Sequence, residues 1–143
     1  MAFFVDFLIG AVLGAGFIVL ARALGRLERA VFAGGLLLAA LAYVGFGLGP
    51  RAGSELTVEL GGSLLFAVLG VLGLVSSSWF LALGWAVHAA WDLVVPSLAD
   101  VSYMPVWYAA ACIGFDGVVA AYLSGRARGR LPIAAAGDPA HAA

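Results

Sequence analysis

Charged residues are scarce in this sequence: only 10% of its 143 residues are charged, whereas 64% are hydrophobic. A soluble domain carries about 25% charged residues, so this chain has too few of them to cover a surface that faces water. Its formal net charge is −1, which excludes the basic surface that nucleic-acid binding requires. The composition therefore predicts an integral membrane protein that has the lipid bilayer as its partner and binds no nucleic acid.

Cysteine and histidine are almost as scarce as charge. Cys112 is the single cysteine, which excludes an intrachain disulfide. Of the two histidines, only His88 lies in an apolar segment, and His141 is near the C-terminal end. A zinc hydrolase normally needs three protein ligands with several histidines, and a bis-histidine haem needs two. The sequence also contains no GxSxG, HExxH, Walker or CxxC motif, and it identifies no cofactor.

Long apolar runs are abundant instead. About 20 apolar residues suffice to cross a bilayer as a helix, and five such runs are present, at residues 3–24, 30–49, 56–75, 79–98 and 106–124. Only three serines, residues 76–78, separate the third run from the fourth, which is typical of a tight helical hairpin. We therefore expect an all-α bundle of five transmembrane helices in one domain, residues 1–125, followed by an exposed, mobile tail at residues 126–143.

The arginines predict the orientation of this bundle. A five-span arrangement puts six of the seven on one side of the membrane: Arg22, Arg26, Arg29, Arg126, Arg128 and Arg130. Because basic residues favour the cytoplasmic side, we expect the N-terminus outside and the C-terminus in the cytoplasm. With four or six spans, the two arginine clusters would lie on opposite sides of the membrane. No basic residue precedes the first span, so we do not interpret it as a cleaved signal peptide.

Two apolar spans contain ionisable residues near their centres. His88 and Asp92 are four residues apart in the fourth span, and so are Cys112 and Asp116 in the fifth, so each pair lies on one helix face. In antiparallel neighbouring helices, His88 lies level with Asp116, and Asp92 level with Cys112. An aspartate at the centre of a membrane helix costs about 2.5 to 3.5 kcal/mol. We therefore expect the two faces to meet in one buried polar site.

Other side chains are candidates for the same site or for simpler roles. Trp91 lies close to the face of His88, and Tyr43 is a candidate for the wall of a pocket. Glu59, early in the third span, is expected to extend its carboxylate toward the outer surface rather than to cover the site. The predicted ligand- or ion-binding residues are His88, Asp92, Asp116, Trp91, Cys112 and Tyr43. If a metal binds, its ligands are expected to be His88, Asp92 and Asp116.

Three segments resemble one family of small bacterial and archaeal membrane proteins that is known only as a domain of unknown function. They are GWAVHAAWD at residues 84–92, CIGFD at residues 112–116 and YVGFG at residues 43–47. Family members carry two histidines directly after the Trp-Asp pair, where this chain has Val-Val-Pro at residues 94–96. That difference counts against a metal site with several histidines. The resemblance implies a multi-pass protein of the prokaryotic plasma membrane, and it implies no activity.

Three functions remain open at this point. The first is a binding or transport module for a proton, a cation or a small lipophilic molecule such as a quinone. The second is an accessory subunit, in a homo-oligomer or a larger membrane complex, whose polar cluster only joins helices. The third is an intramembrane enzyme that modifies a lipid by acid–base chemistry. A GxxxG pattern at residues 10–14 is weak support for a dimer in a chain with 20 glycines.

Overall fold

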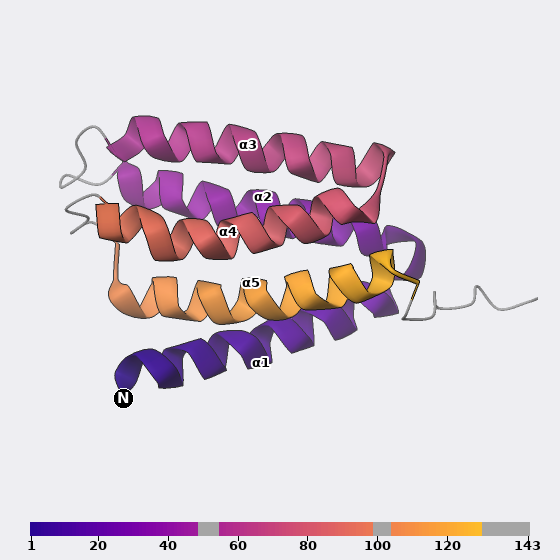
Figure 1. Cartoon of the computed structure of the whole chain (residues 1–143), viewed down its shortest axis with the longest axis horizontal. Helices are drawn as coiled ribbons and strands as arrows, with labels where there is room; N and C mark the ends of the chain where they lie inside the picture. Colours follow the sequence, from indigo (N-terminus) through magenta and orange to yellow (C-terminus); the bar gives the residue numbers. More distant parts are fainter. Residues whose placement is uncertain (49–54, 99–103, 130–143) are drawn as a thin grey trace, which may run out of the picture.

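A computed structural model describes residues 1–48, 55–98 and 104–129 of the chain. It contains five α-helices, α1 (Ala2–Ala23), α2 (Glu28–Gly47), α3 (Glu55–Val75), α4 (Ser78–Leu98) and α5 (Val106–Ala127), with a short 3-10 helix, η1 (Gly25–Leu27), between α1 and α2 (Figure 1). No strand occurs among the described residues. All five helices are long and apolar enough to cross a membrane, which confirms the all-α class and the five spans.

The observed helix ends differ from the predicted spans by a few residues. Helix α2 begins and ends two residues earlier than predicted, and Gly25 supports the turn before it with a φ of 54°. Helix α5 continues to Ala127, three residues beyond the predicted apolar span. Hydropathy marks where the apolar run ends, whereas the helix ends where its backbone hydrogen bonds end. The proposed mobile tail therefore begins inside a helix, and residues 130–143 lie outside the described part.

The helices pack in an order that differs from their order along the chain. Helix α1 packs on α5, α5 on α4, α4 on α3, and α3 on α2 (Figure 1). Helices α1 and α2 make much less contact with each other, although they are consecutive. The contact between α4 and α5 brings the two polar faces together, and the separation of α1 from α2 leaves space beside them.

Glycines allow the close approach of α1 and α5. A Cβ atom built on Gly14 would lie 2.8 Å from the Phe115 carbonyl oxygen, and one on Gly114 would lie 3.0 Å from the Ala11 nitrogen. Gly10 likewise lies directly against the backbone of Ala111. Small residues permit this backbone contact in a membrane, where no hydrophobic effect drives helices together. The GxxxG surface of α1 is therefore used within the chain.

The outer surface and the interior have similar hydrophobicity. Val12 and Leu38 are 71% and 70% exposed, as suits side chains that face lipid. The interior contains fully buried Phe32, Leu36 and Trp85, and the Trp85 Nε1–H group donates to the Phe32 carbonyl oxygen at 3.2 Å. Aromatic packing and a satisfied indole thus define the core beside the polar cluster.

The described arginines share one end of the bundle, where α1 and α5 end and α2 begins. There, Arg126 of α5 forms an ion pair of 2.8 Å with the Glu28 carboxylate of α2, and the Tyr122 hydroxyl donates to the same carboxylate at 2.7 Å. Arg128 lies over the Trp79 ring, 5.3 Å from its centroid. These contacts place the basic side chains away from the centre of the bundle.

Candidate functional site

Three ionisable side chains meet near the middle of the bundle. His88 Nδ1 lies 2.8 Å from Asp116 Oδ2 and 3.6 Å from Asp92 Oδ2. Helical spacing places His88 and Asp92 on one face of α4, and the packing of α5 brings Asp116 against them. His88 is 1% exposed, Asp92 2% and Asp116 1%, so the group has almost no contact with solvent or lipid. We call these three residues the triad.

Hydrogen bonding in the triad is unequal. An ionised carboxylate only accepts hydrogen bonds, so His88 Nδ1–H donates to Asp116. Both carboxylate oxygens of Asp92 are buried without a hydrogen-bond partner among the described residues. The Tyr43 hydroxyl of α2 is also buried without a hydrogen-bond partner among the described residues. The Tyr43 ring lies edge-on to His88, with ring centroids 5.7 Å apart. Two polar groups beside His88 therefore lack the partners that buried polar atoms normally have.

Glu59 of α3 belongs to the interior, so the expectation that it extends toward the outer surface is wrong. It is 2% exposed and accepts a hydrogen bond of 3.3 Å from Trp91 Nε1–H. Gly62 makes this possible, because a Cβ atom at that position would lie 2.7 Å from Trp91 Cζ2. With Tyr43 and His88, Glu59 and Trp91 surround a void that has no room for a water molecule. The rotation of α3 about its axis, which hydropathy does not reveal, directs Glu59 inward.

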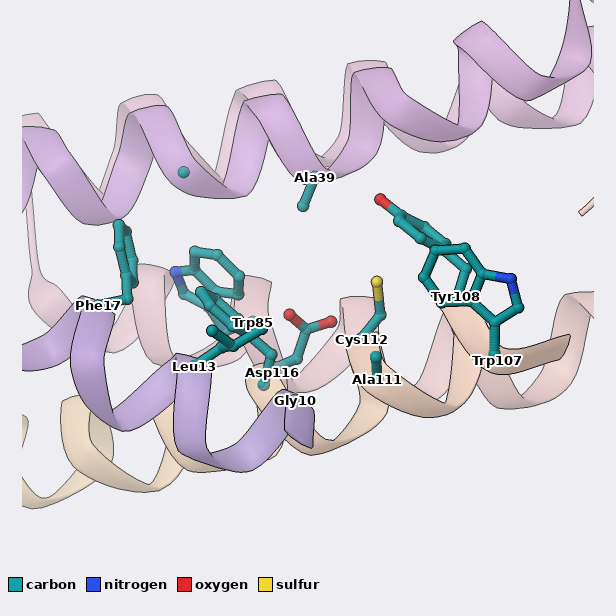
Figure 2. A pocket seen from close by; sticks show the side chains of 12 residues that line it. Gly10, Leu13, Phe17, Ala39, Trp85, Trp107, Tyr108, Ala111, Cys112 and Asp116 are labelled. Atoms are coloured by element: carbon teal, nitrogen blue, oxygen red, sulfur yellow. The ribbon is translucent and has the colours of Figure 1, made fainter. Parts of the chain in front are cut away.

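A larger cavity adjoins the triad at Asp116 and is bounded by α1, α2, α4 and α5. Its volume is about 300 Å³. Figure 2 shows the Asp116 carboxylate and the Cys112 sulfur directed into it, with the Trp85 and Tyr108 rings nearby. Leu13 and Trp107, which also line the cavity, are 59% and 57% exposed. The cavity therefore opens on the surface that faces lipid, and Asp116 joins it to the triad.

The structure places the six residues predicted for the site in three groups. His88, Asp92 and Asp116 offer ligand atoms that all lie within 4.8 Å of one another. Tyr43 and Trp91 adjoin His88 through the small void, whereas Cys112 lies on the wall of the larger cavity. The helical spacing thus predicted the triad. The inward position of Glu59 was missed, and its only signal in the sequence was a carboxylate within an apolar span.

The charges of the site are not balanced by basic residues. Fully ionised, Asp92 and Asp116 carry two negative charges against at most one positive charge on His88, and Glu59 adds a third negative charge nearby. The described arginines lie at the end of the bundle, several helical turns away. Uncompensated charge is costly in a membrane interior, where the dielectric constant is low. A proton or a cation must therefore supply positive charge at this site.

The fold and the site together indicate a class: a multi-pass membrane protein with a buried cluster of one histidine and two aspartates. Within that class, the chain belongs to the family of unknown function DUF6010, whose model matches residues 5–129. The match confirms the resemblance to an uncharacterised family that the sequence motifs indicated. No curated protein and no solved structure matches the chain.

Proposed function

We propose that this protein binds a divalent metal cation at His88, Asp92 and Asp116. The observation that carries the proposal is the Asp92 carboxylate, which has no hydrogen-bond partner among the described residues. It lies 3.6 Å from His88 in a triad whose ligand atoms are within 4.8 Å of one another. Ligands bound to one ion at about 2.1 Å lie about 3 to 4 Å from each other. The 3.6 Å between His88 Nδ1 and Asp92 Oδ2 falls within that range, and the 2.8 Å between His88 Nδ1 and Asp116 Oδ2 would have to lengthen by a few tenths of an ångström around an ion.

A purely structural cluster accounts less well for the same geometry. Polar groups that only join membrane helices satisfy one another, because each unpaired buried polar group costs about 1 to 3 kcal/mol. The Asp92 carboxylate and the Tyr43 hydroxyl are not satisfied in this way. A cation between Asp92 and Asp116 would give the Asp92 carboxylate a partner.

The ligand chemistry narrows the choice of ion. One imidazole nitrogen and two carboxylates suit ions of intermediate hardness such as Mn²⁺, Fe²⁺ and Zn²⁺. The Cys112 thiol is not among the grouped ligand atoms, so a soft ion such as Cu⁺ is disfavoured. Cation binding at His88 Nδ1 displaces the proton of the His88–Asp116 hydrogen bond, so affinity should rise with pH.

The test is a titration of the detergent-purified protein, prepared without a histidine tag, with Mn²⁺ followed by electron paramagnetic resonance and with Zn²⁺ followed by calorimetry. We expect the wild type to bind one ion and Asp92→Asn to bind it more weakly by about tenfold or more. Asp6→Asn is the matched control, since Asp6 lies on α1 outside the triad. His141→Ala controls for the second histidine in the same way.

Two results would overturn the proposal. One is a wild-type protein that binds neither ion. The other is equal binding by the wild type and by Asp92→Asn when both are monodisperse and melt at similar temperatures.

A further inference from the structure

We infer that the cavity between α1, α2, α4 and α5 binds the aromatic head group of a membrane-soluble quinol. The inference goes beyond the cation site and does not require a bound metal. It rests on four properties of the cavity: its opening, its size, the nature of its walls and the position of one carboxylate.

The opening and the size indicate a ligand that is only partly enclosed. The cavity opens toward lipid beside Leu13 and Trp107, and its volume of about 300 Å³ is at the lower limit for a ligand pocket. That space accommodates a substituted ring but not a whole lipid. A ligand with a compact head and a hydrocarbon tail therefore fits best, with its tail extending into the bilayer.

The walls favour a flat ring over an acyl chain. Five aromatic side chains line the cavity: Phe17, Trp85, Trp107, Tyr108 and Phe115. Trp85 and Phe115 pack together with ring centroids 5.6 Å apart, and Phe17 and Phe115 do so at 5.4 Å. Offset and edge contacts between aromatic rings add about 0.5 to 1.5 kcal/mol beyond the area they bury. A planar ligand ring gains such contacts, whereas an acyl chain does not.

The polar groups select the chemistry of that ring. The residues that line the cavity include Asp116 and Cys112 but no arginine or lysine, so no basic side chain would offset the repulsion between a phosphate head group and the Asp116 carboxylate. Asp116 accepts from His88 through Oδ2, and its carboxylate is directed into the cavity (Figure 2). A ring hydroxyl is able to donate to this carboxylate. A quinol has such hydroxyls, and the oxidised quinone has none.

Asp116 belongs both to the wall of the cavity and to the triad. A quinol hydroxyl on Asp116 is one hydrogen bond away from His88, whose Nδ1 atom also lies 3.6 Å from Asp92 Oδ2. A ligand in the cavity therefore contacts the triad through this one carboxylate.

The experiment uses the full chain in detergent under anaerobic conditions with decylubiquinol as the probe. Binding is followed by the quenching of tryptophan fluorescence, because Trp85 and Trp107 line the cavity. We expect saturable quenching by the wild type and at least about tenfold weaker binding by Ala39→Phe, in which a ring fills the cavity. Ala121→Phe carries the same substitution at an exposed position of α5 and should bind as the wild type does.

Further variants keep the inference falsifiable. If Ala39→Phe does not fold, Leu13→Trp narrows the opening from an exposed position and should weaken binding in the same direction. Asp92→Asn should retain decylubiquinol binding, and Ala39→Phe should retain Mn²⁺ binding, so failure of one proposal does not imply failure of the other. Quenching that rises without saturation, or that is equal in the wild type, Ala39→Phe and Leu13→Trp, would overturn the inference.

Discussion

At the scale of single residues, the site is defined by which buried polar atoms have partners. Asp116 has His88 and Glu59 has Trp91, whereas Asp92 has no hydrogen bond. In apolar surroundings, no water replaces a missing hydrogen-bond partner, so a buried polar atom without one destabilises the fold. A substitution that removes one donor should therefore be measurable as a loss of stability.

The hydrogen bond from Trp91 to Glu59 provides such a test. Trp91→Phe removes the donor and leaves most of the packing against Phe66 in place. Interhelical hydrogen bonds in membrane proteins contribute about 0.6 to 1.7 kcal/mol, so we expect a loss of about 1 kcal/mol in the free energy of unfolding. Unfolding in mixed micelles of increasing SDS content measures it.

Trp107→Phe is the control for this prediction, because Trp107 is 57% exposed. The free energy of unfolding of Trp107→Phe should stay within about 0.5 kcal/mol of the wild-type value. Equal losses in both variants would show that ring size, rather than the hydrogen bond to Glu59, accounts for the effect.

At the scale of the elements, the contact between α1 and α5 determines where the cavity lies. Gly10, Gly14 and Gly114 bring the two backbones together, and this close contact leaves α1 apart from α2. The glycines thus serve the site indirectly, since they position the α1 wall of the cavity opposite Asp116.

Gly10→Ala should separate α1 from α5. A Cβ atom at this position would overlap the Ala111 backbone, which is unable to move aside as a flexible side chain does. Overpacking of this kind costs about 1 to 3 kcal/mol, measurable by SDS-induced unfolding. Gly16→Ala, on the same helix with nothing within 4 Å of the added atom, should be neutral or stabilising by up to about 1 kcal/mol. Similar stabilities of the two variants would contradict this account of the α1–α5 contact.

At the scale of the whole molecule, the bundle has one basic end and one central acidic site. Arg126, Glu28 and Tyr122 join α5 to α2 at the basic end, and the triad joins α4 to α5 near the centre. Basic residues favour the cytoplasmic side of a membrane, so we propose that this end faces the cytoplasm and that the N-terminus lies outside.

Cysteine labelling in cells tests this orientation. In a Cys112→Ala background, a cysteine at Leu27, which is 59% exposed in η1, should react with a membrane-impermeant maleimide only after the cells are lysed. A cysteine at Ala2 should react in intact cells. The reverse pattern would place the basic end outside.

The class, the five spans and the juxtaposition of His88 with Asp116 follow from the amino-acid sequence alone. These features depend on local hydropathy and on helical periodicity, which act over one or two helices. Three features emerge only from the packing of the helices: Glu59 turns inward, Cys112 faces the cavity, and the GxxxG surface of α1 packs on α5. Each of these depends on how a helix is rotated about its axis and which neighbour it meets. The lipid-facing and buried faces of these helices are almost equally apolar, so hydrophobicity does not specify the rotation of each helix. The close packing of small residues specifies it instead.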